Sequence, residues 1–472
     1  MSLKATGKIT IAIVAAVIVI VVAVGVGIML MQAPKTTTPT TTPTTAPLTT
    51  TTSAVYGEAR ETTTTSSPAT TPLTTTPTTI PSATTTPTPT TTTTVTTTPP
   101  AKKIKVAILF DVGGRGDLSF NDMAWLGAER AAKDFGVEVK YLTPKSLQDM
   151  IPLLEQLSES GEYNLLVLVG FLWTDPLNKT ADKYPQQKYA LIDATTGVIR
   201  KNEVDILFRE QECASLIGII AAGMAYELGG DTIGAVAGMD IPPLWKFHIG
   251  YLFGAKYFEL KTGKKVNFLW TYTGTFTDPQ AGYTAAMQLL EQGAKVLYGL
   301  AGLTHVGMFN AVIDWNKQGK GKVFAFGQDA SQEWYAPEYI PLSGAKRVDV
   351  AVYTAIKMVV KGTWKGGIIT LGLKEEGVGI WDLEGVKWFA QLAKETGQLK
   401  GKTPEEVVNI VKSIREQYIK DYVWKLVDEL KEKIIKGEIV FKTPQTHDEY
   451  VAIINELEKG NLNAALAKGS VS

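Results

Sequence analysis

The chain has 472 residues and carries 47 basic (Lys, Arg) and 47 acidic (Asp, Glu) side chains, so its net charge is zero. This length exceeds one ordinary hydrophobic core and predicts more than one folded unit. The charge balance argues against nucleic acid binding. The only cysteine, Cys213, excludes an internal disulfide framework, and the three histidines have no ligand-like spacing. We therefore expect no metal and no cofactor.

The first feature along the chain is an uncharged apolar run, Ile9–Met31, which follows Lys4 and Lys8. About 20 apolar residues cross a bilayer core, so the run is long enough to span a membrane. It lacks the shorter apolar region and clear cleavage site of a signal peptide, and no cysteine lies nearby to form a lipoprotein signal. We predict an uncleaved anchor, with a cleaved signal as the alternative. The lysines place residues 1–8 in the cytoplasm and the remainder outside the cell.

Residues 32–101 are dominated by Thr and Pro and contain few large apolar side chains. Such a segment cannot bury enough surface to offset the entropy of ordering it, so it is expected to be disordered. A plain spacer and an O-glycosylated stalk both fit this composition. Either one would hold a folded domain away from the membrane.

From residue 102 onward, apolar strand-like runs alternate with amphipathic helical stretches. This alternation predicts an α/β fold whose parallel sheets are covered on both faces. Two series of such units predict two doubly wound lobes joined by a hinge. The first would comprise about 102–207 and 330–382, and the second about 208–329 and part of the C-terminus. The expected strands are Lys105–Phe110, Val137–Leu142, Leu165–Gly170, Lys188–Asp193, Ile206–Arg209, Thr232–Ala237, Val266–Tyr272, Val296–Leu300 and Val323–Gly327.

The C-terminal part of the chain is mainly helical. Thr403-Pro-Glu-Glu406 is typical of a helix start, because the threonine can cap the helix while the glutamate pairs back to it. A short strand, Glu438–Phe441, and one further helix, Thr446–Lys459, are expected after it.

Three acids follow strand-like runs: Asp111, Asp193 and Asp329. In a doubly wound lobe the ends of neighbouring strands meet beside the ligand, so these carboxylates could accept hydrogen bonds from its hydroxyl or amine groups. The alternative is helix N-capping, which aspartate does routinely. The same acids weigh against a phosphate site at the nearby glycine-rich loop, Gly113–Gly116, because they would repel a pyrophosphate.

Two phenylalanines, Phe120 and Phe276, occupy loops that directly follow strands. Aromatic rings in polar, glycine-containing loops could stack on a flat ligand between the lobes. Packing of each ring against its own helix is the alternative. Lys346 precedes a helix-like run and could hydrogen-bond a ligand, or it could be a solvated charge.

Several motifs along residues 104–380 occur in one order: Asp111-Val-Gly-Gly, Ser119-Phe-Asn121, Ala190-Leu-Ile-Asp193, Phe208-Arg-Glu210, Gly274-Thr-Phe276-Thr-Asp278, Gly327-Gln-Asp329 and Lys346-Arg-Val-Asp349. This series resembles the basic membrane protein family, which includes the bacterial purine nucleoside receptors of ABC transporters. The resemblance implies a type I periplasmic-binding-protein fold that closes on a nucleoside. It also implies that Phe120 and Phe276 sandwich the base, while Asp111, Asn121 and Asp193 hydrogen-bond around it.

The same resemblance implies that Gly302, Asp329 and Lys346 hold the ribose. Two departures bear on the ligand. The family's glycine-rich loop is reduced to a segment that contains the bulky His305, and residues 383–425 look like an inserted helical segment. The membrane helix and Thr/Pro stalk resemble an archaeal arrangement, since bacterial relatives are usually lipid-anchored through a cysteine.

These features predict a monomeric, non-enzymatic receptor on the outer face of the cell membrane. It would bind a nucleoside, with purines favoured, and deliver it to the permease subunits of an ABC transporter. The alternatives are a surface sensor for another small polar or sugar-like ligand and, less favoured, a nucleoside hydrolase.

Overall fold

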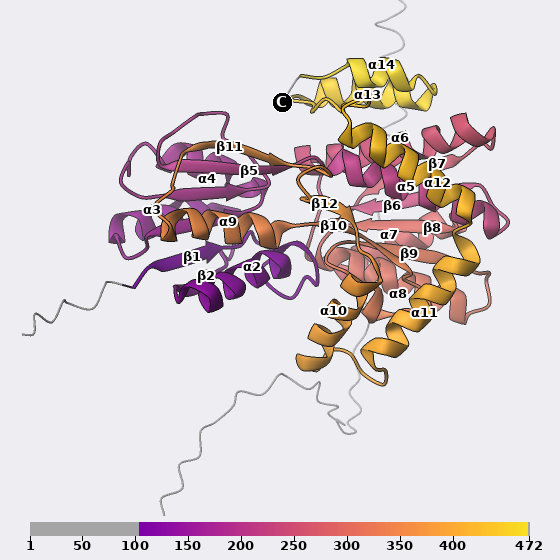
Figure 1. Cartoon of the computed structure of the whole chain (residues 1–472), viewed down its shortest axis with the longest axis horizontal. Coiled ribbons are helices and arrows are strands. Elements are labelled where there is room, and N and C mark those ends of the chain that lie inside the picture. The colour runs from indigo at the N-terminus through magenta and orange to yellow at the C-terminus, as the bar shows by residue number, and fades with distance from the viewer. Residues whose placement is uncertain (1–102, 471–472) are drawn as a thin grey trace, which may run out of the picture. The chain divides into compact units, whose positions relative to one another are not determined.

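The computed structural model describes residues 103–470 (Figure 1). The predicted transmembrane anchor, residues 9–31, and the Thr/Pro-rich stalk, residues 32–101, lie outside this range. Over the described part of the chain, none of the helices combines the length and apolar character that crossing a bilayer requires.

The first lobe is built on a six-stranded sheet in the order β11-β5-β4-β3-β1-β2, in which every pair is parallel. Successive residues of β1 alternate between two apolar clusters, one on each face of the sheet. Both faces are therefore covered, as parallel strands require. The strands are β1 (Lys105–Leu109), β2 (Glu138–Leu142), β3 (Leu165–Val169), β4 (Tyr189–Ile192), β5 (Glu203–Phe208) and β11 (Gly367–Leu371), and the helices are α2 (Phe120–Phe135), α3 (Met150–Ser160), α4 (Thr174–Thr180) and α9 (Val348–Val360).

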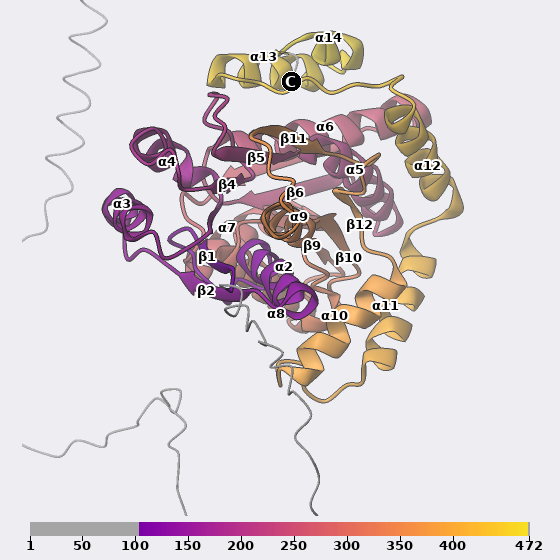
Figure 2. The same cartoon turned by 60° about the vertical axis from the view of Figure 1, so that its left-hand side comes forward.

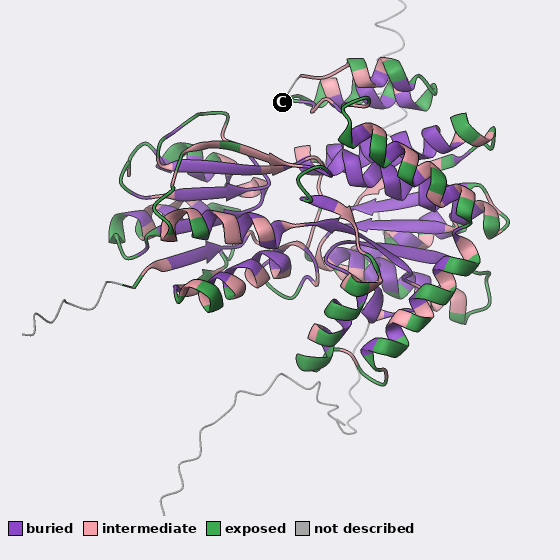
Figure 3. Ribbon diagram, viewed as in Figure 1, coloured by how far each residue is buried: buried purple, intermediate pink, exposed green. Residues whose placement is uncertain are grey.

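The second lobe repeats this plan with the order β12-β10-β9-β8-β6-β7, in which only β12 runs antiparallel. Figure 3 shows the central strands of both sheets buried beneath partly exposed helices. The predicted α/β fold with two doubly wound lobes is confirmed. The elements are β6 (Thr232–Ala237), β7 (Asn267–Tyr272), β8 (Val296–Leu300), β9 (Phe324–Asp329), β10 (Leu342–Lys346), β12 (Val378–Ile380), α5 (Glu210–Glu227), α6 (Pro242–Thr262), α7 (Pro279–Glu291) and α8 (Leu303–Lys317).

The chain passes between the lobes after β5, after β10, and between β11 and β12. The observed boundary between the lobes differs from the predicted one in one respect. The sequence pattern predicts residues 330–382 in the first lobe. Within them β10 and β12 instead join the second sheet, whereas α9 and β11 belong to the first lobe. Figure 2 shows α9 running beside α2 of the first lobe.

Helices α10 (Leu383–Glu395), α11 (Pro404–Tyr418), α12 (Asp421–Ile435), α13 (His447–Glu458) and α14 (Leu462–Ala467) complete the described chain. The predicted start of α11 is confirmed, because Thr403 and Glu406 form a reciprocal capping box. The predicted strand Glu438–Phe441 is wrong. That segment is irregular, and the nearest β-type pairing is an isolated bridge between Thr443 and Ser470.

Helices α5 and α6 pack unusually closely. A Cβ added at Gly254 of α6 would lie 2.0 Å from the carbonyl oxygen of Ser215, and one added at Gly218 of α5 would lie 2.3 Å from that of Tyr251. Side chains at these positions would force the helices apart, so the glycines set the helix separation. This matters for the site, because Pro243, Leu244 and Phe247 at the start of α6 line the cavity between the lobes.

Helix α13 packs on α6 (Figure 1). An aromatic cluster also joins α13 to β7. The ring of His248 stacks on Trp270 with centroids 4.1 Å apart, and its Nδ1 lies 2.6 Å from the hydroxyl of Tyr450. Trp245 stacks on the other side of Tyr450. Burial of His248 lowers its pKa from 6.5 to about 3, so the ring is neutral at ordinary pH.

We predict that His248 makes the protein acid-sensitive. Between pH 6.5 and 3 the unfolded chain binds a proton at this residue while the folded chain does not, so stability falls as the pH falls through this window. The loss reaches about 2–3 kcal/mol by pH 4.5. His248→Phe should flatten the pH dependence of unfolding by this amount, measured by denaturant titration at pH 7 and pH 4.5. Phe268→Leu, which alters the same cluster without removing a titratable group, should keep the wild-type slope. An unchanged slope in His248→Phe would contradict the assignment.

Candidate ligand-binding site

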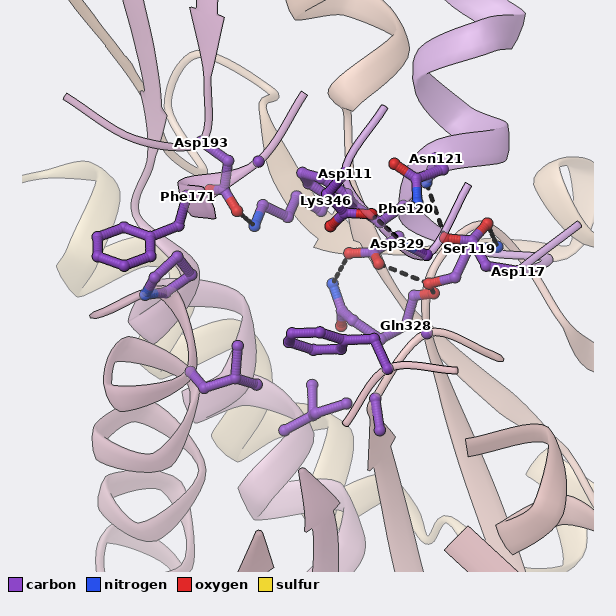
Figure 4. Close-up of a pocket in the computed structure, with 18 of the residues that line it drawn as sticks. Asp111, Asp117, Ser119, Phe120, Asn121, Phe171, Asp193, Gln328, Asp329 and Lys346 are labelled. Atoms are coloured by element: carbon purple, nitrogen blue, oxygen red, sulfur yellow. Dashed lines mark hydrogen bonds and ion pairs between the residues drawn. The ribbon is translucent and has the colours of Figure 1, made fainter. Parts of the chain in front are cut away.

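A cavity with about 720 Å³ of empty space, part of it open to solvent, lies between the two lobes. Its size suits a small molecule. It sits beyond the carboxyl ends of the parallel strands, where doubly wound folds bind their ligands (Figure 4). Its lining includes all eight predicted site residues: Asp111, Phe120, Asn121, Asp193, Phe276, Gly302, Asp329 and Lys346.

The first-lobe wall presents acceptors without partners. Asp111 follows β1, and its Oδ1 accepts hydrogen bonds from the backbone N–H of Gly113 (2.9 Å) and from Nδ2 of Asn121 (3.1 Å). This leaves Oδ2 of Asp111 facing the space near Gly170. The Oδ1 of Asn121 is buried and has no partner among the described residues. Burial raises the pKa of Asp111, whereas Asn121 and the loop amides lower it.

The two predicted aromatic residues come from opposite lobes. Phe120 is the first residue of α2 in the first lobe, and Phe276 lies in the loop between β7 and α7 in the second. The ring of Phe276 rests directly on Gly238, where an added Cβ would approach Cε1 of the ring to 2.2 Å. A side chain at Gly238 would therefore displace the ring. Both rings are half-buried and line the cavity.

A buried charge network joins the lobes at one side of the cavity. The Nζ of Lys346, at the end of β10, lies 2.6 Å from Oδ2 of Asp193 in the first lobe and 2.9 Å from Oε1 of Glu210. A second cation, Lys246 of α6, lies 2.6 Å from Oε2 of Glu210 and donates to the carbonyl oxygen of Phe208. Figure 4 shows the Lys346 side chain extending to Asp193.

These contacts set the protonation of the network. Burial acts to lower the pKa of Lys346, but Asp193, Glu210 and Asp329 raise it on balance, so the ammonium stays charged. Burial alone would raise the pKa of Glu210, but Lys246 and Lys346 hold it at about 2. For Asp193 burial is the larger effect and raises the pKa despite the nearby Lys346. The Oδ1 of Asp193 has no hydrogen-bond partner among the described residues.

A second set of contacts crosses between the lobes at Ser119. Its hydroxyl donates to Oδ2 of Asp329 (2.6 Å) and lies 3.0 Å from the carbonyl oxygen of Gln328, both in the second lobe. Oδ1 of Asp329 accepts from Nε2 of Gln328 (3.2 Å). Burial raises the pKa of Asp329, with Lys346 opposing the shift.

The structure bears on the helix-capping alternative for the three strand-end acids. Asp111, Asp193 and Asp329 do not cap helices. That role falls to Asp117, which accepts the backbone N–H groups of Ser119, Asn121 and Asp122 at the start of α2.

Other site residues were missed at the sequence level. Glu210 and Lys246 lie in the buried parts of α5 and α6, and the sequence pattern does not indicate that these charged side chains are buried. His305, expected near the ribose, is fully buried in the cavity wall, where its Nδ1 accepts the N–H of Ala301. Burial lowers the pKa of His305 to about 3, so the imidazole is uncharged and this part of the cavity wall is neutral.

Comparison with known proteins identifies relatives that this chain matches over most of their length. An uncharacterized lipoprotein of Pyrococcus abyssi is 79% identical over 371 residues, covering 79% of this chain and 92% of the relative. Basic membrane protein A1 of Borrelia garinii is 31% identical and covers 67% of this chain and 91% of its own. An ABC transporter nucleoside-binding protein, BmpA of Lactococcus lactis, is 29% identical and covers 58% of this chain and 80% of its own.

Solved structures agree with the fold. A solute-binding protein of an ABC transporter system from Aeropyrum pernix is 60% identical with a TM-score of 0.76, covering 77% of this chain and all of that one. One from Conexibacter woesei, 20% identical with a TM-score of 0.52, covers 72% of this chain and 99% of its own and supports the fold alone. These neighbours confirm the periplasmic-binding-protein type of fold. A family model described as ABC transporter substrate-binding protein, PnrA-like, matches residues 104–416. The chain thus belongs to the Bmp family of ABC transporter substrate-binding proteins.

Proposed function

We propose that this protein captures a nucleoside, with purines favoured, between its lobes and delivers it to an ABC permease. One observation carries the proposal. Two phenylalanines from opposite lobes, Phe120 and Phe276, line the same cavity as hydrogen-bond acceptors that have no partner among the described residues. A flat base offers both faces to aromatic rings, and its N–H groups and the sugar hydroxyls are donors. The nucleoside-binding relative from Lactococcus lactis supports the same ligand class.

The free polar atoms of the cavity favour a donor-rich ligand. Oδ2 of Asp111, Oδ1 of Asn121 and Oδ1 of Asp193 can only accept while the two carboxyl groups are ionised. The one ammonium that lines the cavity, Lys346, is already shared between two carboxylates. A ligand with several N–H and O–H groups satisfies these acceptors, whereas an anion would meet mainly carboxylates.

We further propose that the domain works on the outer face of the membrane, held there by residues 9–31. Lys4 and Lys8 before this run favour that orientation. The names of the Pyrococcus relatives indicate a lipid anchor in those proteins. In this sequence the only cysteine, Cys213, is buried in α5, so we assign attachment to the apolar run instead.

Removing either ring should weaken binding of inosine, adenosine or guanosine. Stacking of a base on an aromatic side chain contributes about 1–3 kcal/mol, so Phe120→Ala and Phe276→Ala should each raise Kd about 5- to 150-fold. Isothermal titration calorimetry on residues 102–472 measures this. Phe135→Ala, at the far end of the same helix as Phe120, is the matched control and should bind as the wild type does. Wild-type affinity in both pocket variants would refute the sandwich.

The cavity should select nucleosides over nucleotides. A 5′-phosphate would place two negative charges among buried acids whose neighbouring cations are already paired, and desolvating like charges together is costly. We expect inosine 5′-monophosphate to bind at least about 100-fold more weakly than inosine, a difference of about 2.7 kcal/mol. Competition titrations would show this, and comparable affinities would contradict it.

Delivery can be separated from sensing by measuring transport. If the protein feeds a permease, uptake of radiolabelled inosine should fall to background in cells that lack either this chain or the ABC permease that it serves. Cells that carry Phe120→Ala should show the same defect at low inosine concentration. Normal uptake in all three strains would favour the sensor alternative, and release of free hypoxanthine by the purified domain would favour the hydrolase.

A further inference from the structure

Helix α11, part of the segment 383–425 that looks inserted, places one side chain deep in the second lobe. Arg415 is 8% exposed. Its Nη2 lies 3.0 Å from Oε1 of the fully buried Glu333. Its Nε donates to the carbonyl oxygen of Pro341 (2.7 Å), and Nη2 also donates to that of Trp381 (3.2 Å). The guanidinium thus binds three segments: the one after β9, the residue just before β10, and the connection between β12 and α10.

Glu333 in turn holds the loop that follows β9 through hydrogen bonds. Its Oε2 accepts hydrogen bonds from the hydroxyls of Ser331 (2.6 Å) and Ser343 (2.9 Å). The oxygen of Ser343 in turn accepts the backbone N–H of Gln332 (3.0 Å). One carboxylate therefore holds two neighbouring loop residues, Ser331 through its own hydroxyl and Gln332 through the hydroxyl of Ser343.

The side chain of Gln332 connects this loop to the pocket and to the other lobe. Its Oε1 accepts the backbone N–H of Gln328 (2.9 Å), and its Nε2 donates to the carbonyl oxygen of Leu118 (3.0 Å) in the first lobe. Gln328 lines the cavity, and Leu118 adjoins Ser119. The loop lies so close to β9 that a Cβ at Gly327 would stand 2.5 Å from Oε1 of Gln332.

We propose that Arg415 is a positioning residue for the ligand site: through Glu333 and Gln332 it holds residues 328–333 in the conformation that forms one rim of the cavity and contacts the first lobe. The inserted helices then set the geometry of the pocket without touching the ligand. The effect on affinity rests on the nucleoside function proposed above, whereas the effect on the loop does not.

The chemistry favours this role for an arginine. A buried carboxylate that also serves two hydroxyls needs a partner that neutralises it and supplies several donors in one plane, which a guanidinium does. Breaking one side of a buried pair leaves an uncompensated charge, so Arg415→Met alone could impair folding. Two further variants avoid this. Arg415→Lys keeps the charge but loses the fixed fork of donors. The double variant Arg415→Met with Glu333→Gln removes both charges and keeps an acceptor for the serines.

The loop itself is tested first, by hydrogen exchange without ligand. The amides of Gln328 and Gln332 donate within this network, so they should exchange at least about tenfold faster in Arg415→Met and in the double variant, the effect of losing a hydrogen bond to a charged group. Arg415→Lys should lie between these and the wild type. The control is Lys412→Met, one turn away on the exposed side of α11, which should not change the rates. Wild-type exchange in all three Arg415 variants would overturn the proposal, whatever the ligand.

Binding of inosine is tested second, on variants that keep a cooperative unfolding transition. We expect the double variant to bind about tenfold more weakly, mainly through faster dissociation, while Lys412→Met binds as the wild type does. Faster exchange with unchanged affinity would overturn the link to the site. If the wild type binds no nucleoside at all, the proposed function fails, and the exchange measurement alone decides whether Arg415 positions the loop.

Discussion

One buried ammonium group connects the parts of this molecule that make the site. Lys346 reaches from the second lobe to Asp193 in the first and to Glu210, where the chain crosses between them. Separating the lobes would strip this cation of a buried partner, and an unpaired buried charge costs several kcal/mol unless water reaches it. The lobes can therefore separate at low cost only if water enters the pocket and solvates Lys346. Lys246 also pairs with Glu210, so that this carboxylate has a cation on each side.

The two lobes share a plan that extends to the backbone of the site. Asp193 follows β4 and Asp329 ends β9, corresponding strands of the two sheets. Both residues adopt a left-handed conformation, with φ of 70° and 72°, which is uncommon outside glycine although aspartate tolerates it better than most residues. Such backbone strain persists where surrounding contacts enforce it, and it concentrates at functional sites. Here Lys346 holds the first carboxylate and Ser119 holds the second.

The sequence predicted those elements whose signal is local. Apolar runs that lead to Asp111, Asp193 and Asp329 define strands and place these acids at strand ends, which is why all three line one cavity. Gly302 lines it too, as the family resemblance implies. Strands that form because neighbouring strands pair with them are not predicted by the sequence pattern. The β10 strand reads Leu-Ser-Gly-Ala-Lys, without the usual apolar pattern, and is a strand because β9 and β12 flank it. Conversely, the sequence of Glu438–Phe441 is typical of a strand, but in the described part of the chain no strand pairs with it. Glu210 and Lys246 are charged residues in helices whose burial only the assembled lobes reveal.

The indole of Trp381 gives the site an optical property. Its Nε1 donates to the carbonyl oxygen of Asp329 at 2.9 Å, so the ring is bonded to the backbone of a residue that lines the cavity. The guanidinium of Arg347 lies 5.5 Å from the ring, and Phe389 packs against its edge. Indole emission depends on the local electric field and on hydrogen bonding at nitrogen. A ligand that shifts the backbone at Asp329 would therefore also change the surroundings of this indole, which makes Trp381 the place to look for a fluorescence response to binding.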